Sequence, residues 1–284
     1  MTAGASTAVP SVVQSPYGPQ QSGRRPGFLY RRSGMLIVRI VTLVLMLAGW
    51  EWYAADKSIG LLAPPSKVAE AFYRLVIVEQ DLVVALVGSV GTMFVGLFLA
   101  IAVGIPLGIL MGRSRTLESV LDPYVTFLYV LPSVAFVPVL VVMLGIDFQL
   151  RLALIFLSAV FPILINTIAG VKNVDQELID GGVSFCASEV QIMRTIIVPA
   201  TLPFIFAGIR IGFSAAWVGC IVAEMTALIT GVGGLLLESA SRFRTADVFV
   251  AIFGIMFVAV TIQWFATRLE GWMTPWRRES AEGH

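Results

Sequence analysis

The sequence predicts an all-α fold, a polytopic membrane helix bundle with six transmembrane helices and a cytoplasmic helical loop between the fourth and the fifth. The first observation behind this prediction is the composition of the 284 residues, of which 57% are hydrophobic and only 13% are charged. Soluble domains carry about 45–50% apolar and about 25% charged residues. So low a charge content excludes an ordinary soluble enzyme and a disordered protein. The second observation is a set of six long apolar segments.

A helix that crosses a bilayer needs about 20 largely apolar residues. Six segments meet this requirement, and four of them contain no charged residue. The third segment holds Pro132 and Pro138, which predict a broken helix, because freed carbonyl groups are tolerated where protein or a water-filled cavity receives them. The six predicted spans are residues 35–53, 82–112, 124–145, 152–171, 202–229 and 248–266.

The charged residues outside the spans predict the orientation. Residues 1–33 are rich in Ser, Pro, Gly and Gln and are expected to form a disordered cytoplasmic tail. The arginines that close this tail resemble a twin-arginine export signal, but five further spans favour an uncleaved cytoplasmic anchor. Six spans then place both termini, including the tail 271–284, in the cytoplasm. The predicted inner segments carry eleven Lys and Arg against six outside, as the positive-inside rule requires.

Small residues predict where the spans 34–270 pack. The second span has a small residue at every fourth position from Gly88 to Gly112, and the fifth has a shorter ridge of Gly208, Gly212 and Ala216. Lipid gives helices no hydrophobic drive to associate, so close backbone approach must supply the contact. We expect two packing seams, with helix sliding during a transport cycle as the alternative interpretation.

The loop 172–198 is predicted to form two short helices joined by a turn near Cys186. Its first part, 174–180, is acidic, which suits a helix N-terminus. Ser188 and Gln191 fit a capping box, so a second helix should run from Ser188 to about residue 197, before Pro199 and Pro203 mark the entry to the next span. A rigid helical knob of this kind is the shape needed to receive force from a soluble partner.

The stretch 177–203, ELIDGGVSFCASEVQIMRTIIVPATLP, resembles the cytoplasmic signature of permease subunits of ATP-binding cassette importers. In register, Asp180, Gly181 and Gly182 stand where the family has Glu-Ala-Ala, and Cys186 stands where it has Gly. Between residues 60 and 270, further segments in matching order are similar to the branch that imports sulfonates, taurine, nitrate or bicarbonate. The ATPase-coupling residues that the resemblance implies are Asp180, Gly181, Gly182, Ser184, Cys186, Ala187, Ser188 and Pro199.

The resemblance implies a permease subunit in the cell inner or plasma membrane. It implies a homodimer in the lipid bilayer, two cytoplasmic ATPase subunits at the loops and an extracytoplasmic solute-binding protein. The expected substrate is a small anion such as a sulfonate, nitrate or bicarbonate, and a pyrimidine-like or aromatic acid is the alternative. The departures from the signature matter, because each glycine costs about 0.8–1.0 kcal/mol of helix stability relative to alanine. We therefore expect weaker ATPase binding than in members with the usual motif.

Several side chains inside the spans are candidates for the translocation path. Arg210, Ser214, Trp217 and Glu224 fall at helical spacings on one face of the fifth span. Ionisable groups inside a membrane are functional candidates by default. The alternative is that Arg210 and Glu224 extend to the inner and outer interfaces. Asn166 and Pro132 complete the candidate set, although Asn166 would equally serve to bridge helices.

The sequence offers no catalytic machinery. None of its three lysines is preceded by glycine at the spacing of a phosphate-binding loop, and its one histidine is His284. We expect a non-catalytic chain with no cofactor and no metal site. The net charge of +1 gives no indication of nucleic acid. A gradient-driven secondary transporter and a membrane-embedded enzyme remain alternatives, but coupling carboxylates and paired acid–base groups are not evident.

Overall fold

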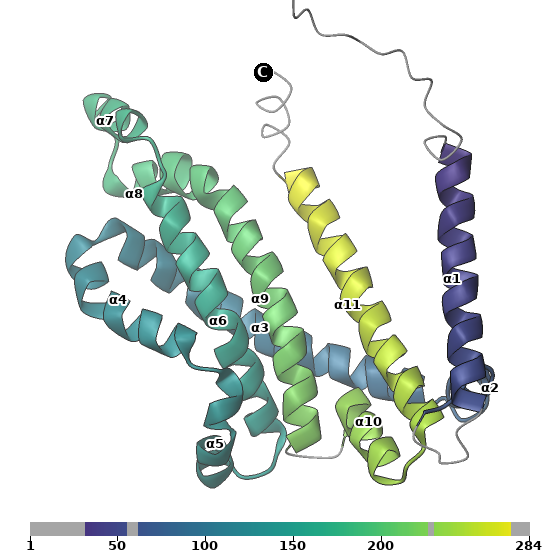
Figure 1. The fold of residues 1–284 in the computed structure, drawn as a ribbon. Helices are drawn as coiled ribbons and strands as arrows, with labels where there is room; N and C mark the ends of the chain where they lie inside the picture. The colour runs from purple at the N-terminus through teal and green to yellow at the C-terminus, as the bar shows by residue number, and fades with distance from the viewer. Residues whose placement is uncertain (1–31, 56–61, 227–229, 274–284) are drawn as a thin grey trace, which may run out of the picture. The chain divides into compact units, whose positions relative to one another are not determined.

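The computed structural model describes residues 32–55, 62–226 and 230–273 (Figure 1). Within these residues all regular secondary structure is helical. The longest helices are α1 (Arg32–Ala55), α3 (Asp81–Arg113), α6 (Phe148–Lys172), α9 (Val198–Thr226) and α11 (Thr245–Met273). The shorter elements are α2 (Pro65–Tyr73), η2 (Arg74–Val78), α4 (Arg115–Val130), η3 (Ser133–Phe136), α5 (Val137–Leu144), α7 (Gln176–Ser184), α8 (Glu189–Ile192), η4 (Met193–Ile197) and α10 (Gly231–Ser241).

The chain divides into two compact units, residues 1–50 and 51–284. The first contains most of α1, a helix long and apolar enough to cross a membrane. Most of the predicted tail 1–33 lies outside the described residues, as do positions 227–229 of the predicted fifth span and positions 274–284 of the predicted C-terminal tail. Helix α11 continues to Met273 and therefore includes the first residues assigned to that tail.

Five described helices meet the length and hydropathy of membrane spans, and a bent pair would make a sixth. The predicted third span, residues 124–145, corresponds to this bent pair. Helix α4 begins at Arg115, and the chain bends by 92° between Arg115–Val130 and Ser133–Leu144. The predicted break is confirmed at Pro132, whereas Pro138 lies in the first turn of α5, where the missing amide donor costs nothing. Helices α2 and α10 were not predicted at all.

Helix α6 packs between the two ridges of small residues. A Cβ atom built on Gly108 of α3 would lie 2.7 Å from Thr167 Cβ, and one built on Gly208 of α9 would lie 2.9 Å from Asn166 Cβ. The side chain of Ile163 is fully buried and lies against both ridges, near Gly104 and Gly212. The predicted seams are thus confirmed from Gly96 to Gly112 in α3 and at Gly208 and Gly212 in α9, whereas Gly88 meets nothing within 4 Å. Helices α3, α6 and α9 form the core of the second unit.

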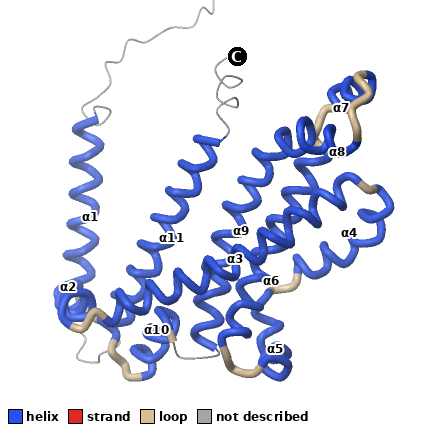
Figure 2. Tube along the Cα trace, turned by 180° about the vertical axis from the view of Figure 1, so that it is seen from behind, coloured by secondary structure: helices blue, strands red, loops and turns tan. Residues whose placement is uncertain are grey.

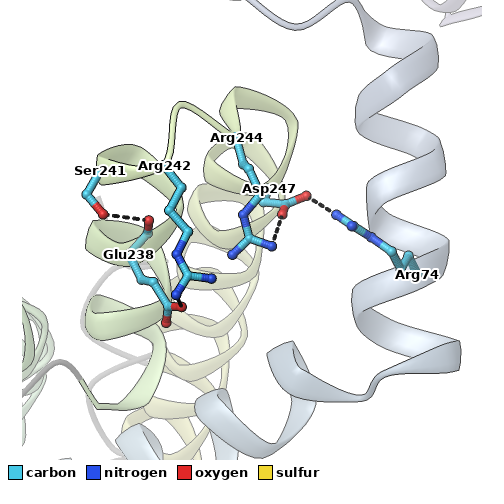
Figure 3. A network of polar contacts seen from close by, with 6 residues as sticks. All are labelled: Arg74, Glu238, Ser241, Arg242, Arg244 and Asp247. Atoms are coloured by element: carbon cyan, nitrogen blue, oxygen red, sulfur yellow. Dashed lines mark hydrogen bonds and ion pairs between the residues drawn. The ribbon is translucent and has the colours of Figure 1, made fainter.

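Opposite ends of this core carry different elements. Both views place α7 and α8 at one end of α6 and α9, and α5 and α10 at the other (Figures 1 and 2). At the α10 end, Asp247 at the start of α11 forms ion pairs with two arginines (Figure 3). One is Arg74 of η2, and the other is Arg244, whose Nη1 lies 3.3 Å from Asp247 Oδ2. Arg242 and Glu238 pair beside it at 2.9 Å. The Arg74–Asp247 pair fixes η2 to α11.

Candidate functional site

The loop between α6 and α9 is a helix–turn–helix, as predicted. Helix α7 begins after Asp175, whose Oδ1 accepts the amide of Glu177 at 3.0 Å. Helix α8 begins after Ser188, and the predicted capping box is present. Ser188 Oγ accepts the amide of Gln191 at 3.3 Å, and Gln191 Oε1 accepts the amide of Ser188 at 2.7 Å. Both starts therefore depend on residues of the loop itself.

The second loop helix does not end near residue 197, contrary to the prediction. It continues through the π-helical segment η4 into α9, so that Glu189–Thr226 is one helix of 38 residues. Pro199 lies at the start of α9, and Pro203 lies inside this helix without ending it. A proline inside a helix removes one backbone donor, and the π-helical segment η4 directly before Pro199 is the kind of irregularity that accommodates such a loss. The loop and the span are consequently a single element.

The turn between α7 and α8 is tight and exposed. Cys186 adopts a left-handed backbone conformation with φ 56°, the geometry that a glycine occupies without strain. The amide of Cys186 donates to the Val183 carbonyl at 2.8 Å, and the amide of Ala187 donates to the Gly182 carbonyl at 3.0 Å. The neighbouring Phe185 side chain is 89% exposed. A cavity of about 390 Å³ lies beside the turn, between its residues and Ile192, Thr195 and Ile196.

The other signature residues in α7 make hydrogen bonds within that helix or, in the case of the two glycines, differ in the space around them. Asp180 Oδ1 accepts the side-chain amide of Gln176 at 2.9 Å, and the Ser184 hydroxyl donates to the Asp180 carbonyl at 2.9 Å. A Cβ atom on Gly181 would meet nothing within 4 Å, whereas one on Gly182 would lie 3.0 Å from Ile196 Cδ1. Alanine is therefore accommodated freely at one glycine and tightly at the other.

Buried contacts and ion pairs fasten the loop to the spans. Ile179 of α7 and Ile192 of α8 are buried in one cluster with Val171 and Ile197. Arg113 at the end of α3 pairs with Glu189 of α8 at 3.0 Å. Lys172 at the end of α6 pairs with Glu118 of α4. A load applied to the loop is thus applied to the spans.

A second feature is a groove of about 490 Å³ at the break between α4 and η3. It is lined by the end of α4, the η3 turn and the facing sides of α6 and α9, and it contains two of the predicted path residues, Pro132 and Ser214. Its polar groups are mainly hydroxyls. The Ser158 hydroxyl lies 2.8 Å from that of Ser133 across the groove wall. The break also leaves backbone carbonyls without helical donors, which is tolerated where they line a cavity.

The other predicted path residues are not in this groove. Arg210 Nη1 pairs with Glu270 Oε2 of α11 at 3.0 Å, one helical turn from Ser214. The Asn166 side chain is half-buried, donates to the Pro162 carbonyl at 2.8 Å and contacts α9 where a Cβ on Gly208 would lie. Trp217 is buried, and its indole N–H donates to the Ile255 carbonyl at 3.3 Å. The predicted face therefore passes from an exposed half to a buried half.

Glu224 lies deepest on that face. It is fully buried, and its Oε2 accepts the Ser89 hydroxyl at 2.9 Å and the Gly233 amide at 3.0 Å. Glu224 also lies two residues before the end of α9, so the alternative position near a membrane interface stays open beside this enclosure by protein. Its surroundings are α3, α9 and α10, away from the residues that line the groove.

Sequence reasoning missed Ser133, Ser158, Ser89 and Glu270. The first three are hydroxyls inside spans that are otherwise apolar, and that contrast is the signal that could have found them. Glu270 was missed because the last span was predicted to end at residue 266, while α11 continues for another two turns.

Residues 104–275 match the family described as the binding-protein-dependent transport system inner membrane component. The taurine transport system permease protein TauC of Escherichia coli (strain K12) is 32% identical over 263 aligned residues, and the match covers 90% of this chain and 95% of TauC. The nitrate import permease protein NrtB of Synechocystis is 27% identical over 90% of this chain and 95% of NrtB. The bicarbonate transport system permease protein CmpB of Synechococcus elongatus is 26% identical over 89% of this chain and 96% of CmpB.

Solved structures give the fold. A chain from the inward-facing conformations of the MetNI methionine ABC transporter superposes with a TM-score of 0.61 and 18% identity. The superposition covers 68% of this chain and 96% of that chain. This chain therefore shares its fold with that chain.

Proposed function

This chain belongs to the family of binding-protein-dependent transport system inner membrane components, and on that premise we propose that it is the permease subunit of an ATP-binding cassette importer. The observation that carries the proposal is the span of the family match, residues 104–275, which contains the helical loop and every residue that lines the groove. The chain supplies the path, and separate cytoplasmic subunits hydrolyse ATP. It has no enzymatic activity of its own in this scheme.

The α7–α8 loop is the docking point for the ATPase subunit. Its caps are internal to the loop, its turn exposes Phe185, and a cavity opens beside Cys186. These features suit a partner that inserts around a preformed knob, since a preorganised surface loses little entropy on binding. In this proposal the spans lie in the cell inner membrane. Helices α7 and α8 and both termini lie in the cytoplasm, and α10 lies on the extracytoplasmic side.

The groove at the α4–η3 break is the translocation path. Residues of α4, η3, α6 and α9 line this groove but leave it open, and we infer that a second copy of the chain closes it. Ser133, Ser158 and Ser214 each place one hydroxyl on the groove, and an oxyanion would take these donors over from their protein acceptors, such as the Leu154 carbonyl that accepts from Ser158 at 2.8 Å. The relatives TauC, NrtB and CmpB are named for taurine, nitrate and bicarbonate, which supports a small anionic substrate. An extracytoplasmic binding protein delivers it, and transport is inward.

Uptake assays test the substrate and the energy source together. The chain is co-expressed with its ATPase subunit and binding protein, and uptake of taurine, nitrate, bicarbonate, a pyrimidine and an aromatic acid is measured. We expect uptake of one of the anions, lost when the ATPase carries an inactivating substitution. Uptake that an uncoupler abolishes while ATP is held constant would instead show a secondary transporter.

Copurification tests the docking point. Phe185→Ala should lower the amount of ATPase subunit recovered with the permease at least fivefold, because it removes the most exposed apolar side chain of the turn. Phe243→Ala is the matched control, since Phe243 is 76% exposed in the turn between α10 and α11 at the opposite end. Equal recovery of the ATPase with both variants would refute the assignment of the loop.

A further inference from the structure

The N-terminus of α10 is capped by two other helices rather than by its own sequence. The N-cap residue Thr230 makes no side-chain capping bond. The free amide of Val232 donates instead to Ser89 Oγ of α3 at 2.9 Å. The free amide of Gly233 donates to Glu224 Oε2 of α9 at 3.0 Å. Unsatisfied first-turn amides are costly when buried, so α10 depends on α3 and α9 for its start.

The two capping side chains also bind each other. The Ser89 hydroxyl lies 2.9 Å from Glu224 Oε2, and both residues are fully buried. The Cys220 thiol lies beside them, 3.7 Å from Glu224 Oε1, and is fully buried as well. We call Ser89, Glu224 and the first turn of α10 the trans cap. It requires α3 and α9 to keep one particular spacing.

The first turn of α10 is packed closely against α9 at the trans cap. Gly231 has φ 64°, and a Cβ atom on Gly233 would lie 2.7 Å from the Ile221 carbonyl oxygen and 2.8 Å from Glu224 Cβ. The glycines of the segment TGVGGLL therefore let α10 approach α9 closely enough for the carboxylate to reach its amide. A small separation of α3 from α9 would break the bonds rather than stretch them.

Glu224 is connected to the docking loop by continuous helix. The helix Glu189–Thr226 has 38 residues and is roughly 55 Å long at 1.5 Å per residue. Its first residues belong to the loop, and Glu224 lies two residues before its other end. Ser89 belongs to a separate helix, α3. A displacement of the loop therefore acts on Glu224 through the backbone of its own helix, but on Ser89 through side-chain contacts at the end of α3, such as the exposed Arg113–Glu189 ion pair.

We propose that Ser89 and Glu224 are positioning residues of the transport cycle, which hold α10 in place until movement of the α7–α8 loop separates α3 from α9 and releases it. The proposal rests on the proposed function, because the ATPase subunits supply that movement. The far end of α10 carries the Glu238–Arg242 pair, next to the Arg244–Asp247–Arg74 contacts of the same surface (Figure 3). Release of α10 thus changes the surface at which substrate is delivered.

Cys220 is a natural reporter of the trans cap. The assembled transporter in proteoliposomes is treated with N-ethylmaleimide, without nucleotide and with ATP plus vanadate, and mass spectrometry follows the adduct on Cys220. We expect Cys220 to be protected without nucleotide and to react at least tenfold faster in the trapped state. A cap with a purely structural role would stay closed, so equal protection in both states would overturn the proposal.

Substitutions identify the atoms that matter. Glu224→Leu and Ser89→Ala should expose Cys220 without nucleotide, because each removes one of the two acceptors. Glu224→Gln should keep Cys220 protected and keep uptake within twofold of wild type, because its amide oxygen still accepts the Gly233 N–H. Ser239→Ala is the matched control, since it removes a fully buried serine hydroxyl of α10 outside the cap and should leave Cys220 protected.

The outcomes separate this inference from the proposed function. A complex that does not assemble with an ATPase subunit refutes the proposed function, and the release step with it. A complex that assembles and hydrolyses ATP but protects Cys220 equally in both states refutes the release step alone. If Glu224→Gln exposes Cys220 as Glu224→Leu does, or if Ser239→Ala exposes it too, the assignment of the trans cap is wrong.

Discussion

A helix start lies near each end of the helix Glu189–Thr226, and the first-turn amides of the two starts find their hydrogen-bond acceptors in different ways. At one end, α8 starts with a capping box built from Ser188 and Gln191, three residues apart. At the other end, α10 starts with amides that are satisfied by Ser89 and Glu224, from two other helices. The first start is exposed and self-sufficient, whereas the second is buried and depends on the packing of the bundle.

The difference follows from what each end must do. A docking knob must keep its shape while its partner is absent, so its hydrogen bonds have to come from its own residues. An element that has to respond to the spacing of two helices must draw its hydrogen bonds from both of them. Local caps give stability that is independent of the fold, and distant caps make a helix conditional on the fold.

The largest expected loss of stability comes from a substitution in the buried cap of α10. Glu224→Leu leaves the Gly233 amide and the Ser89 hydroxyl without their shared acceptor, which should cost about 2–4 kcal/mol of stability. Glu189→Leu removes an exposed ion pair at the other end and should cost less than about 1 kcal/mol. Thermal unfolding of the purified chain in detergent measures both, and similar losses for the two variants would contradict the comparison.

Glycine substitutions should have opposite signs at the two ends. Gly233→Ala forces a Cβ atom against the Ile221 carbonyl and should destabilise the protein by about 1–3 kcal/mol. Gly181→Ala places its Cβ in open space within α7 and should stabilise the helix by about 0.8–1.0 kcal/mol. Melting temperatures of both variants decide the matter. A stabilised Gly233→Ala variant would show that α10 is not held closely against α9.

A non-glycine residue with a left-handed backbone conformation occurs in the α7–α8 turn and another in the α10–α11 turn, which allows a matched test. Cys186 has φ 56° and Phe243 has φ 57°, so replacement by glycine should relieve roughly 1 kcal/mol at either position. Only Cys186→Gly should also increase the ATPase subunit that copurifies, because only that turn lies in the proposed docking loop. If recovery of the ATPase does not rise, the departure of this turn from the family signature has no bearing on docking.

The smallest effect concerns the caps themselves. Ser188→Ala should destabilise the start of α8 by about 1 kcal/mol and speed hydrogen exchange at the Gln191 amide. Thr230→Ala should leave the exchange of Val232 and Gly233 unchanged, because Thr230 makes no capping bond to α10. Faster exchange at these two amides in Thr230→Ala would mean that α10 is capped locally after all.

Much of the fold could be predicted from residues near one another in the chain. Membrane-spanning helices follow from runs of apolar residues, the seams follow from small residues at every fourth position, and the start of α8 follows from Ser188 and Gln191. The third span was only half predicted. Pro132 indicated a break, but a bend of 92° depends on how α4 and α5 pack against α6.

The candidate functional residues also divide into what local sequence determines and what tertiary packing determines. The sequence placed Arg210, Ser214, Trp217 and Glu224 on one face, which is correct for an ideal helix. It could not say that α11 would bring Glu270 to Arg210, or that α10 would bury Glu224. Each of these depends on helices from elsewhere in the chain, and periodicity within a single helix carries no information about its neighbours.

By itself, the sequence determined the all-helical membrane class, the packing seams and the capped loop, because helix formation, bilayer crossing and capping are set by residues within a few positions of one another. Only the tertiary structure decided that Ser89 and Glu224, 135 positions apart, meet and cap α10. Hydrogen bonds of that kind exist only after α3, α9 and α10 have packed. Their satisfaction is a property of the assembled bundle, and no local pattern encodes it.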